Sequence, residues 1–392
     1  MVSLPKPFFM KNTTFYLTLL ITTILTPNLL AQKANIHDIA WIMAGNIPPA
    51  HQQNVSVGLA GAAIGVLANK LVLAGGNNFP DQMPWEGGKK RYYDDIFVYA
   101  KSTTGLTLAD TNCKWKLPFN LAYSAVCSTP KGMVIAGGEN ENGLVNKVLL
   151  LTWNAGALTT SYLPDLPNGL TNAALTYKGD KLYVAGGENA DGASNQFLSL
   201  NLNALNDGWK ALEDLPHPVS HTVLVSAGDE IYLISGRMKN VGDTSTIYNQ
   251  VYAFKLSEHT WTTKNAMPYP VSAATGIVKG NDILIFSGDE GKTFHETEKL
   301  IATIDREKDT LKKETLNRQK AKLQEGHPGF AKTVLKYSLL KGNWTVLKST
   351  MPYGTVTTTA VIFDEEIVVA GGEIRAGVRT PHILVGKIKY TK

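Results

Sequence analysis

Six short apolar runs along the chain each end in a Gly-Gly or Ser-Gly doublet, and this repetition constrains the fold more than any other feature. The runs are LVLAGG, MVIAGG, LYVAGG, IYLISG, ILIFSG and IVVAGG, which end at Gly76, Gly138, Gly187, Gly236, Gly288 and Gly372. Successive doublets lie 62, 49, 49, 52 and 84 residues apart. We interpret this spacing as a basal period of about 49 residues that insertions lengthen twice.

The stretches around each doublet have the pattern of four strands. The apolar runs are typical of strands buried on both faces, and the glycines let the backbone turn where a side chain would clash. A third strand is expected after each doublet, and a fourth often carries a tryptophan and ends at a proline, as from Trp209 to Pro216. A period of about 50 residues resembles the kelch repeat, in which each repeat forms one four-stranded blade. The sequence therefore predicts an all-β fold, a six-bladed kelch β-propeller.

The two chain ends carry complementary parts of one blade. After the last doublet, only one strong strand, His382 to Tyr390, precedes the end of the chain. A tryptophan strand is missing there and is found near the start, where Trp41 precedes Pro48 by the spacing that separates Trp209 from Pro216. We predict that this N-terminal strand completes the sixth blade, which removes an exposed sheet edge.

The start of the chain has the layout of a secretory signal peptide. Lys11 precedes an apolar stretch at residues 15–25, and a polar break then leads to a cleavage site after Ala31. The apolar stretch is short for a membrane anchor. We therefore predict a signal peptide at 1–31, a propeller at 32–392, and an exported, periplasmic protein that is free of the membrane after cleavage.

Charge and cysteine content narrow the possible partners. The formal net charge of +5 falls to +3 once Lys6 and Lys11 leave with the leader, and no patch of basic and aromatic residues has a pattern that suggests nucleic-acid binding. A nucleic-acid partner is therefore not expected. The two cysteines, Cys113 and Cys127, could form a disulfide after export or remain two buried thiols. No set of tyrosine, histidine and cysteine indicates a copper site, and neither cysteine has the partners of a metal site, so no metal is expected.

The first insertion, residues 75–99, is rich in aromatic and amide side chains and also carries Lys89, Lys90 and Arg91. Stacking rings together with amide donors suit a sugar, which has apolar faces and hydroxyl edges. The alternative is a loop that packs on itself and covers one end of the ring.

The second insertion lies in the fifth blade, at about residues 292–332, and is strongly charged with high helix propensity. Gly326 and Pro328 end the helical run. A lid over the mouth of the ring, a docking arm and a solvated excursion are all consistent with this pattern.

The segment GGEIRAGVRT after the last apolar run combines opposite charges. Glu373 is followed by Arg379, and Gly377 between them lets the loop bend. Glu139 and Glu188 also follow doublets, but without a paired arginine. The pattern fits either a general acid–base group with an anion clamp or a repeated structural feature of the turn.

We call the first insertion, residues 75–99, the aromatic-basic loop. Its combination with the helical insertion and GGEIRAGVRT resembles the bacterial sialic acid mutarotases, also called N-acetylneuraminate epimerases. That family consists of exported six-bladed kelch propellers. The order of the blades, with the aromatic-basic loop first and the glutamate–arginine blade last, resembles a cyclically permuted branch of the family. The aromatic-basic loop matches through Gly75, Gly76, Phe79, Gly88, Lys89, Lys90, Tyr92 and Asp95.

The resemblance implies a cofactor-independent isomerase that interconverts the α and β anomers of N-acetylneuraminate by acid–base ring opening. It implies that Glu373 accepts the proton and that Arg379 binds the sugar acid, while Ala376 replaces a proline of the family. The candidates for substrate binding are Asn78, Phe79, Lys90, Glu139 and Arg237. The alternatives are a non-catalytic periplasmic glycan-binding propeller and a kelch scaffold for protein interactions.

Overall fold

The computed structural model describes residues 1–5, 7, 35–103, 105–110 and 114–391. The chain divides into a short unit, Met1–Lys33, and a large unit, Ala34–Lys392. Nearly all of the predicted signal peptide, its cleavage site and Cys113 lie outside the described residues. In the part of the chain that is described, no helix combines the length and the hydropathy that a transmembrane span requires.

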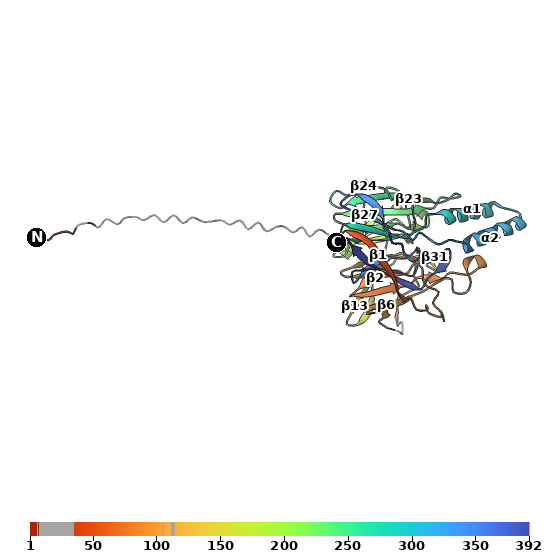
Figure 1. Cartoon of the computed structure of the whole chain (residues 1–392), viewed down its shortest axis with the longest axis horizontal. Helices are drawn as coiled ribbons and strands as arrows, with labels where there is room; N and C mark the ends of the chain where they lie inside the picture. The colour runs from red at the N-terminus through yellow and green to blue at the C-terminus, as the bar shows by residue number, and fades with distance from the viewer. Residues whose placement is uncertain (6, 8–34, 104, 111–113, 392) are drawn as a thin grey trace. The chain divides into compact units, whose positions relative to one another are not determined.

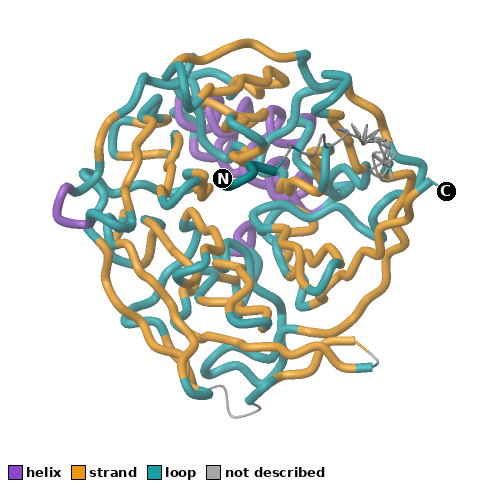
Figure 2. Tube along the Cα trace, turned by 90° about the vertical axis from the view of Figure 1, so that its left-hand side faces the viewer, coloured by secondary structure: helices purple, strands orange, loops and turns teal. Residues whose placement is uncertain are grey.

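The large unit is a ring of six β-sheets (Figures 1 and 2). From the axis outward, the first three blades contain β2 (Ala63–Leu67), β3 (Lys70–Ala74), β6 (Asp95–Ser102) and β7 (Gly105–Leu108); β9 (Ala125–Thr129), β10 (Gly132–Ala136), β13 (Val148–Asn154) and β14 (Ala157–Leu163); and β15 (Ala174–Lys178), β16 (Lys181–Ala185), β19 (Phe197–Asn201) and β20 (Lys210–Ala211). The short strand β8 (Trp115–Lys116) also pairs with β6.

The other three blades repeat this order. They contain β21 (Val223–Ala227), β22 (Glu230–Met238), β23 (Thr246–Lys255) and β24 (Thr260–Lys264); β25 (Thr275–Lys279), β26 (Asp282–Phe286), β27 (Val334–Ser338) and β28 (Asn343–Val346); and β29 (Ala360–Phe363), β30 (Glu366–Ala370), β33 (His382–Tyr390) and β1 (Ile36–Asn46). The prediction of a six-bladed propeller is confirmed.

The ring closes as the sequence predicts, because β1 is the outermost strand of the sixth blade. It pairs antiparallel with β33 over nearly its whole length, and Trp41 lies opposite Gly386. The Trp41 ring packs edge-on against Phe286 of the fifth blade, with centroids 5.8 Å apart. The N-terminal strand thus covers the edge of β33 and contributes to the packing between the last two blades.

The core consists of apolar layers between neighbouring blades. Among the described residues, six clusters of buried side chains occur, one for each interface; Leu71 and Phe97 of the first blade, for example, pack against Val368 and Ile383 of the sixth. The second strand of each blade is apolar and buried on both faces because neighbouring blades cover it on either side.

The recurring tryptophans also join neighbouring blades. Trp209, Trp261 and Trp344 each donate an indole N–H bond to a backbone carbonyl of the preceding blade, over 2.9, 3.2 and 2.8 Å. This repeated bond accounts for the tryptophan at the outer strand, because a buried indole N–H is normally paired with an acceptor.

In five blades the doublet turns the chain where the second strand ends; in the fourth, β22 continues through it to Met238 with a register shift between Ile234 and Gly236. At Gly75 and Gly76, φ is +66° and +105°, and a Cβ on Gly75 would lie 2.2 Å from the carbonyl oxygen of Leu121. Only glycine fits that approach without a shift. In the fourth and fifth blades, Ser235 and Ser287 take the first position with φ of +57° and +59°.

After each doublet the chain leaves the blade at one mouth of the ring. Short two-stranded ribbons form there: β4 (Asn77–Asn78) with β5 (Arg91–Tyr92), β11 (Glu139–Asn140) with β12 (Gly143–Leu144), β17 (Glu188–Asn189) with β18 (Gly192–Ala193), and β31 (Glu373–Arg375) with β32 (Val378–Arg379). Two 3₁₀ turns are also present, η1 (Pro84–Glu86) and η2 (Leu205–Asp207).

The insertion in the fifth blade is helical, as predicted, and forms two helices, α1 (Lys292–Arg306) and α2 (Thr310–Glu325). The Asp309 side chain caps α2 by accepting a bond from the backbone N–H of Lys312 over 3.0 Å, which separates the two helices. Both helices and β31 lie at the same end of the large unit (Figure 1).

Candidate functional site

One residue from every blade stands at the same place around the mouth, directly after the doublet. Each forms an antiparallel bridge with the segment that enters the innermost strand of its own blade. The six residues are Asn77, Glu139, Glu188, Arg237, Asp289 and Glu373. Because the repeat places them equivalently, their side chains form a polar rim around the axis.

A second set of equivalent residues lies next to the axis. These residues have φ between +53° and +65° and comprise Gly61, Tyr123, Asn172, His221, Ala273 and Thr357. Five backbone hydrogen bonds of 2.8 to 3.0 Å link them from blade to blade, from Thr357 round to Ala273. They stand at one end of a cavity of about 350 Å³ that the innermost strands of all six blades line.

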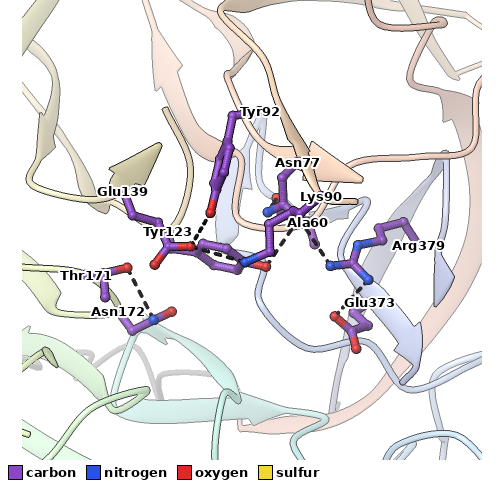
Figure 3. Close-up of polar contacts among 10 residues, drawn as sticks. All are labelled: Ala60, Asn77, Lys90, Tyr92, Tyr123, Glu139, Thr171, Asn172, Glu373 and Arg379. Atoms are coloured by element: carbon purple, nitrogen blue, oxygen red, sulfur yellow. Dashed lines mark hydrogen bonds and ion pairs between the residues drawn. The ribbon is translucent and has the colours of Figure 1, made fainter. Parts of the chain in front are cut away.

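Glu373 and Arg379 face each other across the ribbon β31–β32, where they are paired in register. The Glu373 Oε2 and Arg379 Nη1 atoms are 3.3 Å apart, and the Gly377 N–H donates to Glu373 Oε1 over 2.9 Å. The hairpin therefore explains the spacing of six residues, since it brings the carboxylate and the guanidinium side by side. Figure 3 shows the pair at the edge of the rim.

The Arg379 side chain is 4% exposed and is held from two sides. Its Nη2 donates to Asn77 Oδ1 over 3.1 Å, and its guanidinium carbon lies 4.6 Å from the centroid of the Phe79 ring. Its Nε has no hydrogen-bond partner among the described residues, and its Nη1 faces the Glu373 carboxylate without a well-aligned hydrogen bond. A buried cation with open N–H groups in a fixed plane can donate to an anionic ligand.

Lys90 and Glu139 form a second charged pair at the mouth, between the first two blades. Lys90 Nζ lies 3.2 Å from Glu139 Oε1 and 4.9 Å from the centroid of the Tyr123 ring. Tyr92 donates to the same Glu139 oxygen over 2.6 Å. Figure 3 shows these side chains grouped around the Tyr123 ring.

Both donors to Glu139 keep their protons at neutral pH. Burial opposes the charge on Lys90, but Tyr123, Glu139 and Tyr92 outweigh it and raise the pKa of Lys90. Burial, together with the bond to Glu139, raises the pKa of Tyr92 to about 12. The cluster therefore presents an ammonium group and a phenol O–H.

Asn78 lies behind the rim instead of facing it. It is 1% exposed, its Nδ2 donates to the Gly58 carbonyl over 2.9 Å, and its Oδ1 accepts from Tyr93 and Gln53 over 2.8 and 3.0 Å. Its amide is thus engaged within the fold. The neighbouring Asn77 is the asparagine that contacts Arg379.

Arg237 stands on a different part of the rim from the other predicted residues. Its Nη2 is 3.5 Å from Glu188 Oε1 of the third blade, and its guanidinium carbon is 4.7 Å from the centroid of the Phe294 ring on α1. The other predicted residues lie on three consecutive blades: Glu373 and Arg379 on the sixth, Phe79 and Lys90 on the first, and Glu139 on the second.

The two insertions meet above the mouth. Helix α2 of the fifth blade contacts η1 in the aromatic-basic loop. A Cβ on Gly377 would lie 2.7 Å from Pro84 of η1, which shows how closely this loop packs on the glutamate–arginine ribbon. The aromatic-basic loop and the helical insertion therefore wall the site on the side of Glu373.

Five further residues line the rim or the wall but are not among the sequence candidates: Asn77, Tyr123, Glu188, His221 and Phe294. Asn77 and Glu188 could have been found from their place directly after a doublet. Tyr123 and His221 are marked only by their place before an inner strand, and Phe294 has no signal in the repeat. Among the described residues, no group of His, Cys, Asp and Glu is arranged to hold a metal ion.

The family model of the N-acetylneuraminate epimerases matches residues 163–392. This stretch covers more than half of the chain and includes Glu373, Arg379, Glu188 and Arg237. The chain belongs to the N-acetylneuraminate epimerase family. The aromatic-basic loop precedes the matched residues, so its place in the site rests on the geometry above.

Individual relatives carry the same name. N-acetylneuraminate epimerases of Brucella suis and Brucella melitensis are each 30% identical to this chain over 141 residues, which cover 33% of this chain and 34% of theirs. The epimerase of Vibrio cholerae is 29% identical over 131 residues, 31% of this chain and 32% of its own. The similarity thus spans about a third of the length of these relatives.

Proposed function

We propose that this protein interconverts the α and β anomers of N-acetylneuraminate. The observation that supports this most strongly is the Glu373–Arg379 pair, in which a carboxylate adjoins a buried guanidinium with open N–H groups. Membership of the family and the names of the relatives support a sialic acid as the substrate.

In the proposed complex, Arg379 binds the carboxylate of the sugar acid. Its Nε is the donor without a partner in the protein, while Asn77 and the Phe79 ring fix the plane of the guanidinium. Lys90, which pairs with Glu139, stands on the neighbouring part of the rim. Fixing the acid in this way reduces the entropy lost on reaching the reactive geometry.

Glu373 then moves the proton. Its carboxylate takes the proton from the anomeric hydroxyl, the bond between the anomeric carbon and the ring oxygen breaks, and the ring oxygen receives a proton, directly from Glu373 or through water. The product is the open-chain ketone. Rotation about the adjacent carbon–carbon bond and the reverse steps give the other anomer and restore the carboxylate. Every step is assigned to residues of this chain, and we propose that no cofactor takes part.

The carboxylate of Glu373 is positioned for this role. The Gly377 N–H holds Oε1, and Arg379 Nη1 lies near Oε2, so the group has a fixed direction while its side chain stays 19% exposed. A positioned general base contributes roughly 10²- to 10⁴-fold to a rate.

The test is NMR of freshly released α-N-acetylneuraminate. We expect the wild type to equilibrate the anomers well above the spontaneous rate, and Glu373→Gln to lose roughly a hundredfold or more of that acceleration. Glu258→Gln, in the exposed turn between β23 and β24, is the matched control and should keep it. A fully active Glu373→Gln would refute the assignment. A wild type that binds the sugar without accelerating exchange would favour the glycan-binding alternative.

We also propose that the chain is exported to the periplasm after cleavage of residues 1–31, as the leader pattern indicates. Cell fractionation followed by N-terminal sequencing of the mature protein tests this, with Gln32 expected as the first residue. A cytoplasmic protein that retains Met1 would contradict it.

A further inference from the structure

A second carboxylate–guanidinium pair stands across the mouth from Glu373 and Arg379. Glu188 and Arg237 follow the third and fourth doublets and bridge to Thr171 and Ser220 in the same register in which Glu373 bridges to Val356. In a ring of six blades, the third lies opposite the sixth. The two pairs therefore form opposite walls of one mouth.

Glu188 is held through one of its two oxygens. Its Oε1 accepts a bond from Ser220 Oγ over 2.7 Å and lies 3.5 Å from Arg237 Nη2. His221 Nδ1 is 3.0 Å from Ser220 Oγ and 3.8 Å from the same carboxylate oxygen. All of these contacts with the Glu188 carboxylate are made by Oε1. Glu188 Oε2 has no bond to another described residue, so this oxygen can accept from a ligand.

The Arg237 guanidinium is packed against an aromatic ring in the same way as that of Arg379. Its guanidinium lies against the Phe294 ring as that of Arg379 lies against Phe79, with separations of 4.7 and 4.6 Å. Its Nε is buried and has no hydrogen-bond partner within the described part of the chain. Because Phe294 belongs to the first turn of α1, the helical insertion contributes directly to this wall.

The charges of this wall balance. Burial, reinforced by the positive charge of Arg237, lowers the pKa of His221 well below its usual value, so this histidine is neutral at pH 7. One carboxylate and one guanidinium remain. The groups left for a ligand are an acceptor oxygen, a donor N–H and an aromatic ring, which together complement a neutral polar group with a small apolar end.

We propose that Glu188, Arg237 and Phe294 form a subsite for the acetamido group of the sugar acid. The amide N–H would donate to Glu188 Oε2, the amide carbonyl would accept from the Arg237 guanidinium, and the methyl group would contact the Phe294 ring. This inference rests on the proposed function, because it assigns a second part of the same ligand to the opposite wall. It makes these residues determinants of specificity, with proton transfer remaining at Glu373.

The test compares kcat/KM for N-acetylneuraminate with kcat/KM for the analogue that carries a hydroxyl group in place of the acetamido group. A site built to pair with a polar group discriminates strongly against a ligand that lacks it. We expect the wild type to favour the acetamido sugar, and Arg237→Gln and Glu188→Gln to lower the ratio of the two values roughly tenfold. Phe294→Leu should lower it by a smaller factor through loss of ring contact with the methyl group.

Two controls separate the possible outcomes. Arg318→Gln, on the exposed face of α2, should leave the ratio at the wild-type value. A third sugar with a shortened hydroxyl tail keeps the acetamido group, and the variants should discriminate it as the wild type does. An unchanged acetamido ratio, or a change that follows the tail instead, would overturn the proposal.

The proposed function fails separately, because in that case the wild type exchanges the anomers of neither sugar. Saturation-transfer NMR provides a second readout that does not depend on turnover. The acetamido methyl signal should show the strongest transfer in the wild type and should lose it selectively in Phe294→Leu. Equal transfer in both proteins would count against the subsite even if a glutamine variant folds poorly.

Discussion

Asn77 accepts a hydrogen bond from Arg379 across the junction between the first and last blades, although 302 residues separate them in the sequence. Asn77 is fully buried, and its Nδ2 donates to the Ala60 carbonyl over 2.9 Å. One amide thus ties the arginine of the sixth blade to the innermost segment of the first. The same contact therefore links the first and sixth blades and orients the guanidinium of the site.

The first prediction concerns this contact. Asn77→Ala leaves Arg379 Nη2 without its partner, which costs about 1–3 kcal/mol for a buried group. The Ala60 carbonyl loses the side-chain bond but keeps the bond from the backbone N–H of residue 77. We expect a lower free energy of unfolding and a kcat/KM for anomer exchange reduced roughly tenfold, mainly through a higher KM, because Arg379 loses its fixed orientation. Denaturant unfolding and NMR exchange rates measure the two effects. Asn317→Ala, on the exposed surface of α2, should change neither; unaltered kinetics in Asn77→Ala would show that Arg379 needs no such support.

The difference between Asn77 and Asn78 also shows how far sequence reasoning reaches. The doublets predict the blades, the closing strand and the place of the insertion because each is read from a pattern that repeats along the chain. Which of two adjacent asparagines contacts Arg379 depends on the alternation of sides along β4 and on a blade at the other end of the chain. No repeat carries that information, so the sequence identifies the loop but not this contact.

The sequence names Arg237 as a candidate but does not pair it with Glu188, for a similar reason. Glu188 follows a doublet without an arginine in its own ribbon, a pattern that also fits a structural role. Its arginine, Arg237, comes from the next blade. Phe294 comes from an insertion whose position relative to the ring no periodicity can give. Glu373 and Arg379 were paired correctly because both belong to one hairpin.

The second prediction concerns Gly377, whose φ is +72° and whose Cβ, if present, would lie 2.7 Å from Pro84 Cγ. Gly377→Ala should displace the loop and weaken the bond from its N–H to Glu373 Oε1, so the exchange rate should fall. Gly179→Ala is a matched control, because Gly179 also has positive φ, +53°, but an added Cβ would meet nothing within 4 Å. Both variants should lose about 1–2 kcal/mol of stability from backbone strain. Equal exchange rates in the two variants would contradict a role for the loop geometry.

The third prediction concerns the closing strand pair. A Cβ on Gly386 of β33 would lie 2.8 Å from Ile39 and 2.9 Å from Trp41, both on β1. Gly386→Ala should therefore force β1 outward and lower the free energy of unfolding by about 1–3 kcal/mol, as overpacking does. Gly45→Ala, in β1 itself, is the control, because its nearest contact would be 3.5 Å, an ordinary van der Waals distance. Equal urea midpoints for the two variants would contradict this prediction, because they would show that β1 can move outward at no cost in stability.

The fourth prediction concerns pH. Burial, reinforced by Arg237, lowers the pKa of His221 well below its usual value, and this outweighs the nearby carboxylate of Glu188. Below about pH 6.5, the unfolded chain therefore binds a proton that the folded protein excludes, so stability falls as the pH falls, by up to roughly 1.4 kcal/mol per pH unit.

His221→Gln removes this linkage. Its free energy of unfolding should decline less than that of the wild type between about pH 7 and pH 5, by about 1–2 kcal/mol. Denaturant titrations at the two pH values measure the difference, and the comparison cancels the contributions of all other titrating groups. His37→Gln, at an exposed position of β1, should keep the wild-type slope. If the free energy of unfolding falls equally with pH in the wild type and in His221→Gln, the folded protein accommodates a protonated His221. The imidazolium would then add a positive charge beside Glu188.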